Sequence, residues 1–118
     1  MIMQLPKPIE IYMNSLNTND NNVIDRCIAK DAHVHDIGED NHIYGLIDIK
    51  KWRGISNEEF KLKSEVINAE NKNGIIMVSS ITTGKFSGSP QLFYYFFTVK
   101  DNLITNIEIV PGKENVKL

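Results

Sequence analysis

The sequence predicts an α+β fold in which N-terminal helices precede a long antiparallel meander. Three observations predict this fold. Apolar residues recur at helical spacing near the N-terminus, residues 61–110 alternate as strands do, and turn residues separate the strands. Helices first and strands last is the order of an α+β layout. A curved sheet with helices on its concave face would enclose a pocket between the two layers.

Three helices are expected. The first follows two prolines, which the first turn of a helix tolerates because its N–H groups have no partner there. Its apolar stripe is Ile9, Tyr12, Met13 and Leu16. Asp20 is the predicted N-cap of a second, short helix that carries apolar residues between 23 and 28. The third helix is expected over 46–53, with Trp52 on its apolar stripe.

The strands are expected from residue 31 onward. In the first, over 31–36, alternation places Val34 and Asp36 on one face and His33 and His35 on the other. A second short strand is expected at 43–44, followed after the third helix by longer strands over 61–69, 75–83, 92–99 and 103–110. The turns between them are predicted at 71–74, 84–91 and 101–102.

Composition narrows the function classes. With 118 residues the chain is expected to be a single domain, 1–118. The formal net charge of −2 gives no general attraction to nucleic acids or anionic membranes, and no apolar run is long enough to span a bilayer. One cysteine, Cys27, and the lack of a recognisable signal peptide favour a reducing, cytoplasmic location.

Asp36 is the residue most suggestive of chemistry. It shares a strand face with Val34, so it is expected to face the pocket, where desolvation would raise its pKa towards a range useful for proton transfer. The basic residues nearest in sequence, Lys30 and the 50–53 cluster, are expected on outer faces. The alternative is structural: Asp36 caps the turn before Gly38 or pairs with a basic group.

Four segments resemble a known family: Tyr12–Asp20, Ile28–Asp36, Tyr44–Gly45 and Leu46–Trp52. Together with the element order they resemble the nuclear transport factor two-like superfamily, in particular its ketosteroid isomerase and SnoaL-like polyketide cyclase branches. The resemblance covers nearly the whole chain in layout. It implies an α+β domain in which a cone-shaped, curved antiparallel or mixed sheet wraps around the N-terminal helices and encloses a pocket. It leaves enzymes, binding proteins and scaffolds open as function classes.

The resemblance implies roles for particular residues. Asp36 matches the general base of the isomerases, and Tyr12 matches their oxyanion-stabilising tyrosine. The isomerases place a protonated aspartate on the aromatic strand, where this chain has Tyr94, or Tyr95 if the register differs by one residue. No cofactor is implied. The residues expected to line the pocket are Val34, Trp52 and Phe96.

The segment His33-Val-His35 with Glu39 resembles half of a cupin metal motif. Two histidines at i and i+2 lie on one face of a strand and can chelate. The upstream glycine of that motif is missing, no histidine follows His42, and both histidines are expected to face away from the pocket. We therefore predict no tightly bound metal.

The strand over 92–99 is apolar on both faces. One face can line the pocket, and the other, to which Phe97 is assigned, predicts a homodimer through the C-terminal sheet. The leading interpretation is binding of a small apolar molecule, with proton transfer next to a carbonyl if the chain is an isomerase or cyclase-type enzyme. A non-catalytic ligand-binding or dimerising domain is the alternative, and a metal-dependent enzyme using His33 and His35 comes third.

Overall fold

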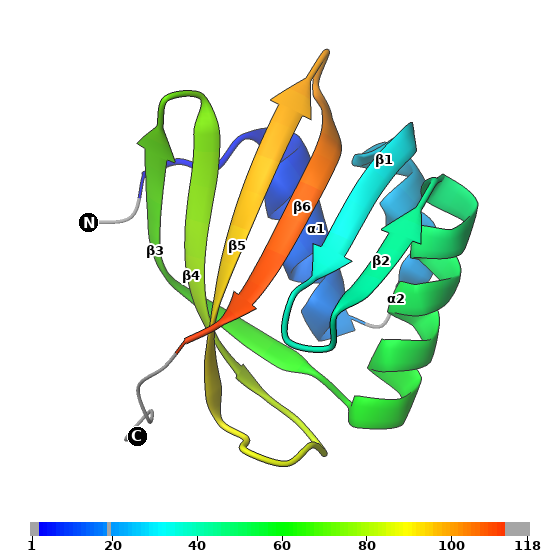
Figure 1. Ribbon diagram of the computed structural model, residues 1–118, viewed down its shortest axis with the longest axis vertical. Helices are drawn as coiled ribbons and strands as arrows, with labels where there is room; N and C mark the ends of the chain where they lie inside the picture. The colour runs from blue at the N-terminus through cyan, green and yellow to red at the C-terminus, as the bar shows by residue number, and fades with distance from the viewer. Residues whose placement is uncertain (1–2, 19, 113–118) are drawn as a thin grey trace.

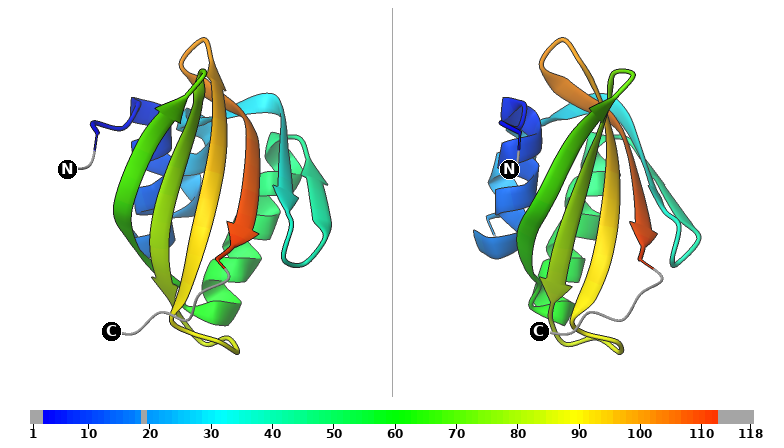
Figure 2. Two further views of the ribbon diagram at one scale, coloured as in Figure 1. Left: turned by 60° about the vertical axis from the view of Figure 1, so that its left-hand side comes forward. Right: turned by 90° about the vertical axis from the view of Figure 1, so that its left-hand side faces the viewer.

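A six-stranded, open sheet curves around the helices, which lie against one of its faces (Figures 1 and 2). The computed structural model describes residues 3–18 and 20–112. In chain order the elements are α1 (Lys7–Thr18), the 3-10 helix η1 (Asn21–Arg26), β1 (Ile28–Asp36), β2 (Asn41–Tyr44), α2 (Leu46–Phe60), β3 (Lys63–Lys72), β4 (Ile75–Thr83), β5 (Gln91–Lys100) and β6 (Leu103–Pro111). The strand order is β2-β1-β6-β5-β4-β3. β1 and β6 run parallel and the other neighbours antiparallel, which confirms the predicted α+β class.

The first two helices begin where the sequence predicts. The carbonyl of Pro6 accepts the backbone N–H of Glu10, which closes the first turn of α1, and Pro8 lies in that turn, where it displaces no hydrogen bond. Asp20 caps η1 by accepting the N–H of Asn22 at 3.1 Å. Cys27 ends η1, so Ile28 starts β1, three residues earlier than the strand was expected.

The third helix, α2, extends to Phe60, seven residues beyond the prediction. It follows Gly45, whose φ of 87° is strained for any residue with a Cβ. It ends at Lys61 in a left-handed conformation. Its buried side chains lie four residues apart on one line, at Ile49, Arg53 and Asn57. Two of these three are polar, and Arg53 contradicts the expectation that the 50–53 cluster lies on outer faces.

Turn residues connect the strands as predicted. Asp101 and Asn102, both at positive φ, form the two-residue turn between β5 and β6. Asn73 and Gly74 do the same between β3 and β4, and the Asn71 side chain accepts the N–H of Gly74. These tight turns hold adjacent strands in fixed register, which determines which face of each strand meets the helices.

The leading prediction for the faces of β5, with Tyr94 and Phe96 inward, is wrong, and the alternative with Tyr95 inward is the one observed. Tyr95 and Phe97 point into the core and are 5% and 0% exposed, whereas Tyr94 and Phe96 lie on the outer face. Antiparallel pairing sets this orientation: Phe97 lies opposite the buried Ile107 of β6. Phe96, assigned to the pocket, and Phe97, assigned to the interface, therefore exchange places.

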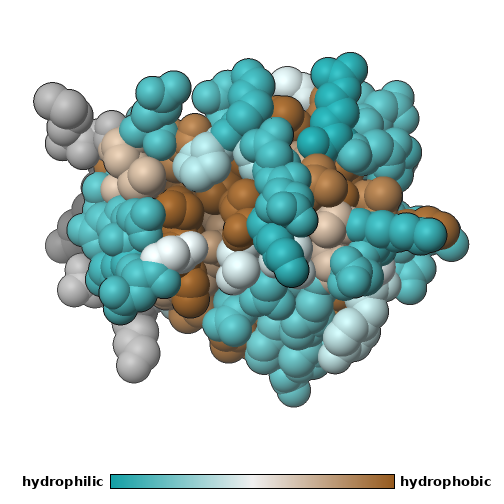
Figure 3. All heavy atoms as spheres, turned by 90° about the horizontal axis from the view of Figure 1, so that it is seen from above, coloured by the Kyte–Doolittle hydropathy of each residue, from teal (hydrophilic) through white to brown (hydrophobic). Residues whose placement is uncertain are grey.

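The core fills the space between the helices and the concave face of the sheet. α1 contributes Ile9, Tyr12, Met13 and Leu16, and the sheet contributes Val34, Val78, Phe97 and Ile107 among others. Viewed from above, apolar side chains also show at the surface between rims of polar ones (Figure 3). No helix in the described part of the chain is long and apolar enough to cross a membrane.

Candidate functional site

Three polar side chains from three elements lie close together inside the fold, and a fourth at the end of β1 interacts with them electrostatically; we call these four the inner polar cluster. They are Tyr12 of α1, Asp36 at the end of β1, Arg53 of α2 and Tyr95 of β5. Burial raises the pKa of Tyr12, Asp36 and Tyr95. The positive charge of Arg53 acts against this rise in all three, and the Asp36 charge adds to it in both tyrosines. The four groups are therefore close enough to interact electrostatically across the core.

Tyr12 is 0% exposed, and its hydroxyl has no hydrogen-bond partner among the described residues. Its ring is held edge-on by Tyr95 and Phe97, with centroid distances of 6.5 Å and 5.7 Å. Burial raises the Tyr12 pKa well above its ordinary value, so the hydroxyl keeps its proton at neutral pH. The hydroxyl is thus a neutral hydrogen-bond donor without an acceptor, which is the property required of an oxyanion donor.

Arg53 is a buried cation, 4% exposed. Its Nη2 donates to Asn57 Oδ1 at 2.5 Å, and Asn57 in turn donates to the carbonyl of Ser15 on α1 at 3.4 Å. Its Nε has no partner, and no carboxylate of the described residues lies within ion-pair distance. A buried guanidinium without a counter-ion is costly, so it favours negative charge nearby.

Asp36 is half-buried at the end of β1. Desolvation is the largest effect on its carboxyl and raises its pKa, while the backbone amide of Glu39 acts in the opposite direction. This confirms the predicted direction of the shift and its cause. A carboxylate with a raised pKa exchanges protons more readily at neutral pH than an ordinary surface aspartate does.

The other predicted pocket residues lie in different surroundings. Val34 is completely buried between its strand partners Ile43 and Ile107, and Trp52 is half-buried on α2 with the Arg53 guanidinium 5.1 Å from its ring centroid. Tyr94 and Phe96 are on the outer face of β5, so Tyr95, the alternative in the sequence, is the inward tyrosine. The roles of these residues stay predictions.

Two surface hollows, of about 400 and 420 Å³, lie away from the inner polar cluster. One lies between η1 and the start of α2, with Asp25 and Lys50 in its lining. The other lies between β1 and the β5–β6 turn, with Asp31 and Asp101 in its lining. Neither contains a residue of the cluster, so the enclosed pocket expected from the sequence stays a prediction.

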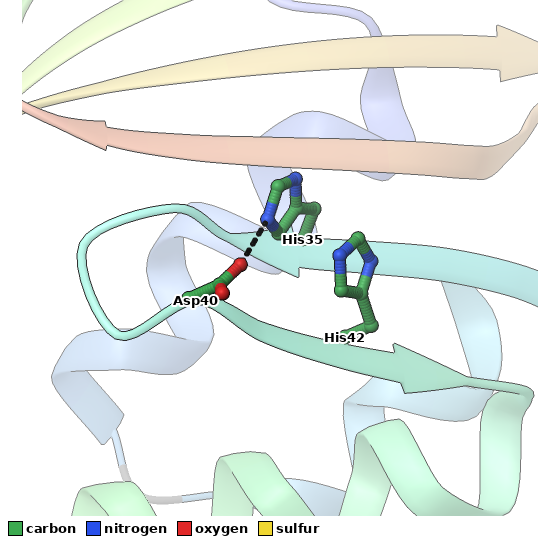
Figure 4. A group of neighbouring side chains, drawn as sticks. All are labelled: His35, Asp40 and His42. Carbon is green, nitrogen blue, oxygen red and sulfur yellow. Dashed lines mark hydrogen bonds and ion pairs between the residues drawn. The ribbon is translucent and has the colours of Figure 1, made fainter.

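The histidines lie on the outer face of β1, away from Asp36, as predicted. His33 and His35 stack against His42, which the antiparallel pairing of β2 brings alongside, with ring centroids 5.1 Å and 3.8 Å from its own. Asp40, in the β1–β2 turn, lies 3.4 Å from His35 (Figure 4). The sequence analysis treated His42 only as the last histidine and missed this grouping.

Arg53 is the member of the inner polar cluster that the sequence analysis missed. A signal for it was present: continuing the helical spacing from Ile49 in steps of four reaches Arg53 and Asn57. Ending the predicted helix at 53 hid the pattern. A buried helical stripe with an arginine and an asparagine in it indicates a polar interior.

No protein-family model and no curated protein matches the sequence. Among solved structures, a candidate polyketide cyclase from Sinorhizobium meliloti matches with a TM-score of 0.83 and 27% identity, over 90% of this chain and 95% of that one. A Catenulispora acidiphila protein with a ketosteroid isomerase-like fold, in complex with trimethylamine, gives 0.81 at 13% identity over 96% and 91%. An epoxide hydrolase of Mycobacterium tuberculosis gives 0.74 at 14% over 91% and 81%. By these matches, the chain has the fold of the nuclear transport factor two-like proteins.

Proposed function

We propose that the chain binds a small, largely apolar carbonyl compound and transfers a proton at the carbon next to the carbonyl. Asp36 is the base that removes the proton, and the Tyr12 hydroxyl donates a hydrogen bond to the oxygen on which negative charge develops. Arg53 supplies positive charge to that same region. Isomerisation and cyclisation both proceed through such an enolate, and neighbours of similar fold include a candidate polyketide cyclase and ketosteroid isomerase-like proteins.

One observation carries the proposal. The Tyr12 hydroxyl is completely buried, protonated and unpaired among the described residues, in the field of the unpaired cation Arg53. Such a group destabilises the empty protein by about 1–3 kcal/mol relative to a paired one. An enolate oxygen would satisfy it. Preorganised donors that wait for developing charge are typical of sites that stabilise oxyanions.

The isomerases use a tyrosine and a protonated aspartate as hydrogen-bond donors. Here the two proposed donors are the hydroxyls of Tyr12 and Tyr95. Tyr95 takes the place for which Tyr94 was predicted, because it is the inward tyrosine of β5. Tyr94 is left with no part in the proposed chemistry. Val34 and Trp52 are proposed to contribute apolar walls on either side of the cluster.

Hydrogen–deuterium exchange tests the proposal directly. A panel of cyclic and open-chain ketones is incubated with the protein in D₂O, and loss of the proton next to the carbonyl is followed by NMR. Wild-type protein is expected to accelerate the exchange, whereas Asp36→Asn and Tyr12→Phe are not. Asp31→Asn, an exposed aspartate on the same strand, is the matched control and is expected to retain the activity. Ketone binding without exchange would instead support the alternative, a non-catalytic ligand-binding domain.

A further inference from the structure

We propose that the outer surface of the β1–β2 hairpin binds one divalent transition-metal ion of the Zn²⁺ type. The ligands are His35, Asp40 and His42, which we call the hairpin cluster (Figure 4). Each offers one ligand atom, and these atoms all lie within 4.8 Å of one another. The site lies on the opposite face of β1 from Asp36 and shares no residue with the inner polar cluster.

The spacing of the ligand atoms suits one ion. His35 Nε2 and Asp40 Oδ1 are 3.4 Å apart. Two ligands that each lie about 2.0–2.1 Å from a tetrahedral zinc ion are separated by about 3.4 Å. His35 and His42 are direct cross-strand partners, and their rings stack with an interplanar angle of 14°. The hairpin pairing therefore holds both imidazoles on the same side, where a small side-chain movement closes the site.

A chain of hydrogen bonds leaves the required lone pair on His42. His33 Nδ1 lies 3.1 Å from Asn106 Oδ1, an arrangement in which the imidazole N–H donates to the amide oxygen. His33 Nε2 then accepts the Nδ1–H of His42 at 2.9 Å. With Nδ1 protonated, Nε2 of His42 carries the free lone pair. In metal sites, a hydrogen bond to the non-ligating ring nitrogen of a histidine commonly fixes its tautomer in this way.

The ligand chemistry determines the class of ion. Two imidazoles and one carboxylate select zinc and its first-row neighbours over magnesium or calcium, which prefer oxygen ligands. The Asp40 side chain is 90% exposed and that of His35 is 25% exposed, so water completes the coordination and the ion exchanges with solvent. Such a site is compatible with the prediction that the chain carries no tightly bound metal. Of the histidine motif in the sequence only His35 is a ligand here, and Asp40 and His42 of the hairpin provide the other two.

Calorimetric titration of the tag-free chain with Zn²⁺ at neutral pH tests the proposal. Wild-type protein is expected to bind one ion per chain, and His35→Ala and His42→Ala to show no measurable binding. Asp40→Asn is compared with Asp101→Asn, since both aspartates are exposed turn residues at positive φ and no histidine lies on β5 or β6. Asp40→Asn is expected to weaken binding and Asp101→Asn to match the wild type.

Two further measurements separate a metal effect from a folding defect. Zn²⁺ is expected to raise the melting temperature of the wild type but not of His42→Ala, while the two proteins melt alike without metal. His33→Phe, which removes the acceptor for His42, is expected to weaken affinity about 10–100-fold with unchanged stoichiometry. The proposal is overturned if the wild type shows no binding, or if His35→Ala and His42→Ala bind Zn²⁺ as the wild type does.

Discussion

Asp36 combines a strand-end position with a carboxyl whose charged form is disfavoured by folding. Its folded-state pKa lies above the unfolded value of about 3.9, so the stability it contributes is complete below that pH and is lost as the pH rises through the folded pKa. Asp36→Asn removes this loss and retains a side-chain oxygen that can face the Glu39 amide. We expect the melting temperature at neutral pH to be unchanged or higher in the variant.

Thermal melts from pH 3 to pH 8 check this prediction. The difference between Asp36→Asn and the wild type is expected to be smallest at the acidic end, where the wild-type carboxyl is also neutral. Asp31→Asn serves as the exposed control on the same strand. If Asp36→Asn melts well below the wild type at neutral pH, Asp36 is a paired or capping carboxylate, and the structural alternative describes it better.

The Tyr12 hydroxyl is proposed to take part in the chemistry without stabilising the fold, so one substitution tests the two roles separately. Because its hydroxyl is buried without a partner among the described residues, Tyr12→Phe removes an unsatisfied polar group and keeps the ring contacts with Tyr95 and Phe97. We expect the free energy of unfolding to stay the same or to rise by up to about 1 kcal/mol. Urea denaturation measures it. A loss of 2 kcal/mol or more would reveal a hydrogen bond or a bound water that the hydroxyl satisfies.

At the scale of the element, β5 presents two neighbouring phenylalanines on opposite faces. Phe97 is completely buried against Tyr12, whereas Phe96 is half-buried on the outer face. Phe97→Ala is expected to destabilise the fold by about 3–5 kcal/mol, because it leaves a cavity in the core. Phe96→Ala is expected to cost about 1 kcal/mol. Equal losses in denaturant titrations of the two variants would contradict the assigned faces.

The error in β5 has a physical cause that a single sequence does not remove. Where a strand is apolar on both faces, period-two alternation does not distinguish the inner face from the outer one. In β1 the alternation of Val34 and Asp36 with polar His33 and His35 made the orientation predictable. For β5 the orientation depends on long-range pairing with β6, which places Phe96 opposite Glu108 and Phe97 opposite Ile107.

The helices show the same division between local and long-range information. Prolines, the Asp20 cap and the glycine before α2 are local signals, and the helix starts followed from them. The end of α2 was missed because its last turns carry no apolar stripe: the buried positions there are Arg53 and Asn57. α2 packs against β1, η1 and β2, and Asn57 donates to the Ser15 carbonyl of α1. No local pattern encodes these long-range contacts.

For the molecule as a whole, element order and turn chemistry were enough to predict the α+β layout, and the family resemblance added the cone shape. Helices before strands, two-residue turns at Asp101–Asn102 and Asn73–Gly74, and alternating strands all favour the same layout. The arrangement of the inner polar cluster was less accessible, since it brings together residues 12, 36, 53 and 95 from four elements. Asp36 was predicted from strand alternation and Tyr12 through the family resemblance, Tyr95 was only the alternative to Tyr94, and Arg53 was missed.

The outer face of the sheet leads to the last prediction, on assembly. Tyr94 and Phe96 of β5 lie there with Leu92, only half-buried within one chain, so a second subunit packed sheet to sheet would cover them. We expect a homodimer in sedimentation velocity at micromolar concentration.

Phe96→Lys is expected to give a folded monomer, because it places a charge in the interface without touching the core. Ile47→Lys, at a residue of α2 that is 72% exposed, is the matched control and is expected to remain dimeric. Phe97→Lys is unsuitable as a test, since it would bury a charge beside Tyr12 and unfold the chain. A wild-type monomer, or a Phe96→Lys variant that stays dimeric, would exclude this face of β5 as the interface.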